Sequence, residues 1–226
     1  MKTLLPITLL LLIIGGYLYF SRNNKEASDA NKPTASISEI EGQEASKDLE
    51  GTFVFDTNES TAKWTASKKI IKNYVDTGSI KIKTGFATFK EGKIENGEIL
   101  FDMTSISGET TSNTKAPVTK LTDHLKSEDF FDVEKYPIAT YKVTSSQKVE
   151  NGYILSGELT LTGKTNPLDI KVQTAMENGN AIIAGLAEVD RSKWEIKYGS
   201  DSFFDDLGDN VINDIFTLEF KIVARP

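Results

Sequence analysis

The feature that most constrains the fold is a series of short segments, from residue 51 onward, in which apolar and polar residues alternate. Residues 80–83 and 98–103 are clear examples, with aliphatic or aromatic side chains at every second position. This period places successive side chains on opposite faces of a strand, and one polar face is typical of antiparallel sheets. Similar segments lie at 53–55, 62–66, 85–89, 139–143, 153–155, 158–162, 170–172, 181–189 and 216–224. We therefore predict an all-β domain over residues 51–226.

Glycine-containing pairs separate many of these segments. They are Glu91-Gly92, Asn96-Gly97, Asn151-Gly152 and Asn178-Gly179, and a longer connection, GKTNP, occupies residues 163–167. Asparagine and glycine tolerate the positive φ angles of tight hairpin turns, so each pair predicts a hairpin. About eight to ten strands at this spacing indicate an antiparallel sandwich or barrel.

The strand faces predict an apolar interior. In each strand the residues at alternate positions are expected to point inward, and this inward-facing set, the inward phase, is almost free of polar groups. It consists of Ile80, Ile82, Ile99, Phe101, Met103, Leu159, Leu161, Ile170, Val172, Leu218, Phe220 and Ile222. Residues 181–189 add Gly185 and Ala187 to this face. An eight-stranded barrel either fills itself with side chains or holds one slender ligand. The small residues therefore either leave space or accommodate aromatic rings from other strands.

One short helix is predicted over residues 115–127. Val118, Leu121 and Leu125 are spaced three and four apart, and Pro117 suits the first turn. The helix leads into the aromatic pair Phe130-Phe131, which needs an apolar receiver. The pair either walls or plugs a tunnel mouth, or seals one end of the barrel as ordinary core.

Composition excludes several classes of function. The net charge of -7 argues against a nucleic-acid partner. The absence of cysteine excludes disulfides and thiol catalysis, and a single histidine, His124, excludes a multi-histidine metal site. The aspartates of residues 201–214 lack the spacing of a calcium-binding loop, so we expect no metal and no cofactor. We expect His124 to be exposed or bonded to backbone, with a pH-dependent release switch as the alternative.

The N-terminal region differs in composition. Residues 4–20 are almost wholly apolar and would be about 26 Å long as a helix. Residues 1–20 are therefore expected to be an uncleaved membrane anchor or a cleaved signal peptide, and either directs export. Residues 21–50 contain no aromatic side chain and are predicted to be a disordered linker.

Three sequence blocks resemble the YceI-like family: residues 124–141 (HLKSEDFFDVEKYPIATY), 157–172 (GELTLTGKTNPLDIKV) and 190–224. The resemblance covers the chain from about residue 51. It implies a lipocalin-like antiparallel β-barrel of about eight strands, exported to the periplasm or cell envelope. It also implies a non-enzymatic protein that holds a polyisoprenoid or a similar amphiphile, such as an isoprenoid quinone, for sequestration or transport. The anchor-like start and the long linker depart from the family pattern.

Aromatic and aliphatic residues are the candidate ligand contacts. We predict the following residues for the tunnel wall or mouth: Trp64, Phe86, Phe89, Ile99, Phe101, Phe130, Phe131, Tyr141, Leu159, Leu161, Trp194, Tyr198, Phe203 and Phe204. Expected partners are an amphiphilic lipid and, through the N-terminal segment, a membrane, and a homodimer is left open. Two alternatives are an enzyme using Asp190, Arg191 or His124 for proton transfer, and an envelope-stress or adhesion module without ligand.

Overall fold

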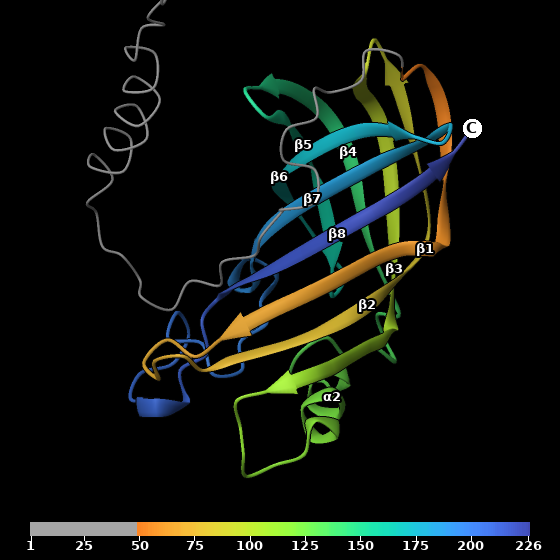
Figure 1. Cartoon of the computed structure of the whole chain (residues 1–226). Coiled ribbons are helices and arrows are strands. Elements are labelled where there is room, and N and C mark those ends of the chain that lie inside the picture. Colours follow the sequence, from red (N-terminus) through yellow and green to blue (C-terminus); the bar gives the residue numbers. More distant parts are fainter. Residues whose placement is uncertain (1–48) are drawn as a thin grey trace, which may run out of the picture. The chain divides into compact units, whose positions relative to one another are not determined.

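In the computed structural model, residues 49–226 can be described, and eight antiparallel strands close into one barrel (Figure 1). Each strand pairs with the next, and β1 pairs with β8. The strands are β1 (Gly51–Ser67), β2 (Val75–Lys90), β3 (Lys93–Thr111), β4 (Ile138–Val149), β5 (Gly152–Leu161), β6 (Lys164–Glu177), β7 (Asn180–Asp190) and β8 (Ile215–Arg225). The helices are α2 (Val118–Lys126) and the 3-10 turns η2 (Arg191–Trp194) and η3 (Gly208–Asn210). The predicted all-β barrel with one helical insertion is confirmed.

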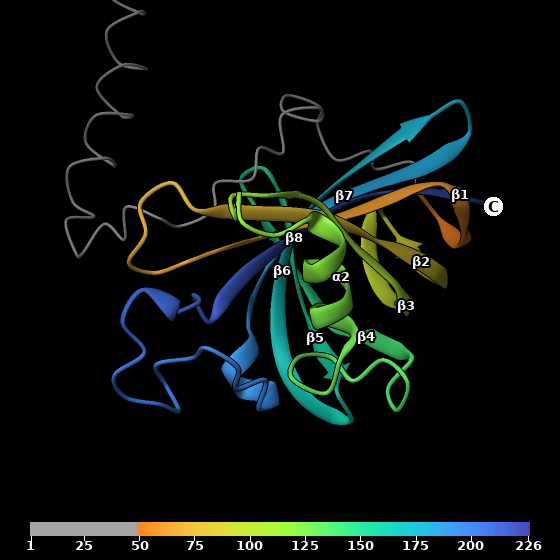
Figure 2. The same ribbon diagram turned by 90° about the horizontal axis from the view of Figure 1, so that it is seen from below.

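Helix α2 lies at one end of the barrel, as Figures 1 and 2 both show. The predicted membrane segment (1–20) and most of the predicted linker (21–50) lie outside the described residues. Among residues 49–226, no helix combines the length and the apolar character needed to cross a membrane.

Three of the four predicted hairpin turns are confirmed. Glu91-Gly92 and Asn178-Gly179 connect consecutive strands, and Glu91 and Asn178 have positive φ angles of 50° and 51°. The third turn is formed by Glu150 and Asn151, one residue earlier than predicted, because Gly152 begins β5 and pairs with Val149. The prediction at Asn96-Gly97 was wrong, because both residues pair with β2 inside β3. Glu91-Gly92 already supplies the single turn that the β2–β3 hairpin needs.

The predicted connection at residues 163–167 was also wrong beyond its first residue. The turn is formed by Thr162 and Gly163, and β6 begins at Lys164. Pro167 pairs with β5, whereas the β6–β7 ladder begins only at Ile170. Pro167 therefore lies where one side of β6 has no ladder, which is a position that proline tolerates in a strand.

The predicted inward phase is confirmed. Its members are buried, with Leu218 partly buried. Leu49 is also fully buried, and its carbonyl accepts a hydrogen bond from the Gly92 N–H (3.0 Å). Because the strands close into a barrel whose core is built from residues 49–224, we expect residues 49–226 to fold without the rest of the chain.

Several aromatic rings of the interior lie against a glycine of a neighbouring strand. Gly185 pairs with Phe220, and Gly78 pairs with Trp64. A Cβ atom at either glycine would overlap the partner's ring. The same holds for Gly85 with Phe55 and for Gly157 with Tyr141. Gly185 therefore accommodates a ring, which was one of the two interpretations left open by the sequence.

Arg191 organises the irregular segment between β7 and β8. Its side chain is buried, and four of its five N–H groups donate hydrogen bonds to carbonyl oxygens. The acceptors are the carbonyl oxygens of Ile196, Tyr198, Ile212 and Asn213 at 2.7–3.2 Å, and the Asp214 carboxylate forms an ion pair with the guanidinium at 3.2 Å. Burial lowers the pKa of the guanidinium, while the negative charge of Asp214 opposes this effect. The cation therefore fixes both ends of the segment.

Replacing Arg191 with methionine should destabilise residues 49–226 by about 3–5 kcal/mol, because a buried carboxylate and several carbonyls lose their partner. Lys193→Met in the same turn is the matched control, because Lys193 is exposed. Urea unfolding measures both variants. An Arg191→Met variant within 1 kcal/mol of the parent would contradict the role of this cation.

Candidate functional site

Two adjoining cavities run through the barrel interior. Cavity 1 has a volume of about 630 Å³ and cavity 2, on the α2 side, a volume of about 820 Å³, each including the open space at its mouth. The cavities share the side chains of Phe101, Leu159, Val189 and Leu218, which form a waist. We refer to the two cavities and the waist between them as the tunnel.

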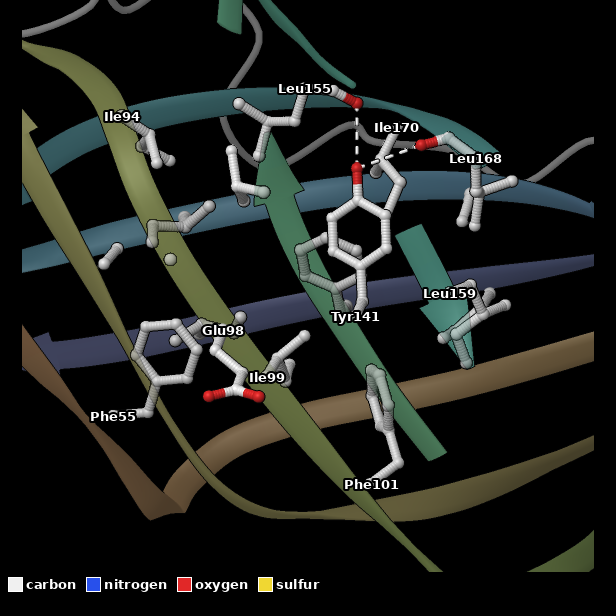
Figure 3. Close-up of a pocket in the computed structure, with 18 of the residues that line it drawn as sticks. Phe55, Ile94, Glu98, Ile99, Phe101, Tyr141, Leu155, Leu159, Leu168 and Ile170 are labelled. Atoms are coloured by element: carbon white, nitrogen blue, oxygen red, sulfur yellow. Dashed lines mark hydrogen bonds between the residues drawn. The ribbon is translucent and has the colours of Figure 1, made fainter. Parts of the chain in front are cut away.

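The wall of cavity 1 is apolar (Figure 3). Glu98 is the one charged residue beside it, and its carboxylate lies 3.4 Å from the ammonium group of Lys142 on the outside of the barrel. The β3–β4 ladder ends at Glu98 and Lys142. Cavity 1 therefore approaches the surface where β3 and β4 separate, next to the partly exposed Val143.

The polar atoms of the interior aromatic residues are bonded within the wall. The Tyr141 hydroxyl lies between two strands, 2.9 Å from the Leu155 carbonyl and 3.0 Å from the Leu168 carbonyl (Figure 3). The Trp64 indole N–H donates to the Ser107 carbonyl (3.2 Å). Because buried N–H and O–H groups need partners, these bonds leave only ring carbon facing the cavities.

The local environment of Tyr141 favours its neutral form. Burial of the hydroxyl raises the pKa of Tyr141 well above its usual value of 10.0, and the negative charge of Asp169 adds to the effect. Tyr141 therefore stays uncharged throughout the physiological range, and the tunnel wall carries no charge at this position.

The structure places the sequence-predicted site residues in three groups. Those that line a cavity are Trp64, Phe86, Ile99, Phe101, Phe130, Phe131, Tyr141, Leu159 and Leu161. Phe89 and Trp194 are almost completely buried and line neither cavity, and the Trp194 indole N–H donates to the Leu159 carbonyl (3.0 Å). Tyr198, Phe203 and Phe204 are exposed on the outer surface. Trp194 is thus separated from the three aromatic residues that follow it in sequence.

Other lining residues were missed by the sequence reasoning. Phe55 and Ile94 line cavity 1, and Phe216 and Leu125 line cavity 2. The alternation at residues 53–55 could have identified Phe55. Ile94 was missed because it stands between a true turn and the wrongly predicted turn at Asn96-Gly97.

Phe130 forms the α2-side boundary of the tunnel. Its ring lines cavity 2 and also an outer pocket between α2 and the β1–β2 connection. The ring centroid lies 4.9 Å from that of His124 and 5.4 Å from that of Tyr198, and the Arg191 guanidinium lies 5.9 Å away. Phe131 is buried behind it. Phe130 therefore lies between the apolar tunnel and the outer pocket, which also contains Tyr74, Asn113 and Lys120 and which we call the vestibule.

The three candidate proton-transfer groups are engaged in local interactions. Asp190 accepts hydrogen bonds from the backbone N–H and hydroxyl of Ser192 (3.1 and 2.6 Å), and Arg191 donates four hydrogen bonds to carbonyl oxygens. His124 Nε2 lies 3.1 Å from the Asp129 carboxylate. In residues 49–226 no three metal-ligating side chains gather.

Replacing Tyr141 with phenylalanine should cost about 1–2 kcal/mol of unfolding free energy at pH 8, through the lost hydrogen bonds. Above pH 10 the unfolded parent releases the Tyr141 proton while the folded parent keeps it, so the parent loses about 1.4 kcal/mol per pH unit. The stability difference between parent and Tyr141→Phe should therefore shrink by about 1 kcal/mol between pH 10 and 11, because the unfolded tyrosine is only half ionised at pH 10. Urea unfolding at pH 8, 10 and 11 measures it, and a constant difference would contradict the raised pKa.

Comparisons with known proteins agree with this architecture. The barrel of BcnA from Burkholderia cenocepacia superposes with a TM-score of 0.59 at 18% identity, covering 75% of this chain and 98% of that one. A polyisoprenoid binding domain from Saccharophagus degradans superposes with a TM-score of 0.54 at 14% identity, covering 76% and 97%. At these identities the likeness establishes the fold alone.

Sequence relatives match over shorter stretches. A UPF0312 protein of Photorhabdus laumondii is 34% identical over 85 residues, which are 38% of this chain and 44% of that protein. Protein YceI of Escherichia coli is 33% identical over 94 residues, or 39% and 48%. The chain thus spans about half the length of these curated relatives. The model of the YceI-like domain matches residues 53–224, which is most of the chain, and the chain therefore belongs to the YceI-like family.

Proposed function

We propose that this chain binds a long, slender amphiphile of the polyisoprenoid type in the barrel and sequesters or carries it. The observation that supports this most is the apolar wall of the tunnel, in which the Tyr141 hydroxyl and the Trp64 indole N–H are hydrogen-bonded to backbone carbonyls. Such a wall offers a ligand no hydrogen-bond partner, so an apolar chain loses nothing by leaving water. Affinity would come from burial at about 0.8 kcal/mol per methylene group.

The narrowness of the tunnel selects the shape of the ligand. The side chains of Phe101, Leu159, Val189 and Leu218 line both cavities, so a ligand that occupied both would have to pass between them, which a single slender chain does more easily than a fused ring system. A polar head group would lose its hydration in the apolar cavities, so it should remain outside them. The vestibule beyond Phe130 offers Lys120, Asn113 and Tyr74 as polar neighbours for that head group. An isoprenoid alcohol, phosphate or quinone has this combination of chain and head.

The comparisons support the same class of ligand. The Saccharophagus degradans domain is described as polyisoprenoid binding, and the present chain shares its fold. We further propose that residues 1–20 direct the barrel across a membrane. If residues 1–20 remain as an anchor, residues 21–48 tether the barrel to the membrane; if they are cleaved, residues 21–48 become an N-terminal extension. In that location the domain would meet membrane lipids directly.

A pair of substitutions on β7 tests the tunnel as the binding site. Ala187 faces cavity 1, whereas the adjacent Glu188 is exposed on the outside. Ala187→Phe should lower the affinity of residues 49–226 for geranylgeraniol at least tenfold, because the ring fills space that the chain needs. Glu188→Phe adds the same ring outside the barrel and should leave the affinity unchanged.

Tryptophan fluorescence titration measures the affinity, and urea unfolding verifies that both variants remain folded. Ala139→Phe, which narrows cavity 2, serves if Ala187→Phe fails to fold. Equal affinities of the parent and a folded cavity variant would sink the proposal that the chain lies in this tunnel.

A further inference from the structure

Exposed apolar side chains gather at the α2 end of the barrel. Among the described residues, those at this end are Ile70, Val75, Tyr198, Phe203, Phe204 and Ile215, with 36–58% of their surface exposed. Val54 and Met176 are the exposed large apolar residues near the opposite end. Scattered exposed apolar residues are normal on a protein surface, but a concentration at one end indicates an interaction site.

Two loops carry most of these residues and form one surface. The lysine-isoleucine loop comprises residues 68–74, between β1 and β2, and the aromatic loop comprises residues 195–214, between β7 and β8. The backbone N–H of Lys69 donates to the Val211 carbonyl (3.1 Å), and the Lys69 ammonium lies 2.8 Å from the Asp201 carboxylate. Figures 1 and 2 both show the two loops side by side.

The chemistry of this surface suits the boundary of a lipid bilayer. The lysine-isoleucine loop reads Lys-Lys-Ile-Ile-Lys from residue 68, and in the aromatic loop the Lys197 ammonium lies 5.3 Å from the Phe203 ring centroid. Lysine beside exposed aliphatic and aromatic side chains is typical of segments that lie in the membrane interface, where the rings reach the acyl boundary and the ammonium groups meet lipid phosphates. Protein interfaces, in contrast, are depleted in lysine.

The acidic residues of the aromatic loop limit the electrostatic contribution. Asp205, Asp206 and Asp209 are exposed and offset the lysines, so insertion of the apolar side chains must supply most of the attraction. Binding should therefore survive moderate salt, unlike binding by a purely basic surface.

The surface is continuous with the tunnel mouth. Tyr198 packs on Phe130, and Phe130 lines cavity 2. A chain that passed between bilayer and tunnel at this end would have the rings of Tyr198 and Phe130 along its path. The length of the N-terminal segment permits this orientation, because 28 residues between Phe20 and Leu49 can span at most about 100 Å.

We propose that the lysine-isoleucine loop and the aromatic loop form a membrane-docking face, on which the tunnel mouth contacts the surface of a phospholipid bilayer. The biological role of such docking rests on the proposed function, because docking would bring the tunnel mouth to the membrane lipid that the tunnel is proposed to bind. The binding to a bilayer itself depends only on the exposed side chains.

Flotation of residues 49–226 with phosphatidylethanolamine–phosphatidylglycerol vesicles tests the docking face. This part of the chain is used because the apolar residues 4–20 would partition into vesicles by themselves. The domain should float with the vesicles, and the triple variant Ile70→Ser/Phe203→Ser/Phe204→Ser should lower the bound-to-free ratio at least tenfold. The control Val54→Ser/Met176→Ser removes exposed apolar side chains from the opposite end and should bind like the parent. The inference would be overturned if the parent did not float, which is the result that a protein-binding face would give. It would also be overturned if the triple variant bound vesicles like the parent.

A second measurement separates this inference from the proposed function. The triple variant should bind geranylgeraniol delivered from detergent as tightly as the parent, but should take it from vesicles at least tenfold more slowly. A parent that floats yet binds no prenyl chain would keep the docking face and refute the proposed function. Normal binding of the chain, with equal uptake rates from vesicles for parent and triple variant, would keep the proposed function and refute the docking face.

Discussion

The contact of an aromatic ring with a glycine on the neighbouring strand is the interaction on which the tunnel depends. An eight-stranded barrel has little interior volume, and large rings that projected toward its axis would fill it. The glycines at positions 157 and 185 let the rings of Tyr141 and Phe220 lie where side-chain carbon would otherwise be. Tyr141 can then direct its hydroxyl to carbonyl groups of β5 and β6. The same arrangement thus keeps the interior both open and apolar, which is the combination that a prenyl chain requires.

The two ends of the tunnel differ in construction. Near Glu98 the wall thins because the ladder between β3 and β4 stops. At the α2 end a buried cation, Arg191, holds the irregular segment between β7 and β8 against the barrel, and Phe130 lies over that guanidinium. Ligand binding, ligand entry and membrane contact would all take place at this second end. Here the chain forms an irregular segment, fixed by the side chain of Arg191, in place of regular strands.

The sequence predicted the barrel well because alternation with period two is a direct consequence of a wall that faces water on one side and carbon on the other. It predicted turns less well, since Asn96-Gly97 has the local chemistry of a hairpin but lies within a long strand. It could not decide whether Gly185 leaves space or accommodates a ring, because that depends on Phe220, which is 35 positions away in the chain. Likewise, Trp194 and Phe203 share one irregular segment, yet the first is core and the second is exposed, and only tertiary packing separates them.

Native mass spectrometry of the full chain, purified from a prenyl-lipid-producing host in a mild detergent, tests the central claim most directly. The account predicts one lipid per barrel, with a mass and an extracted composition that identify a prenyl chain, and predicts that Ala187→Phe abolishes this adduct while Glu188→Phe retains it. A barrel that is consistently empty, and that also takes up no added prenyl lipid, would contradict the account.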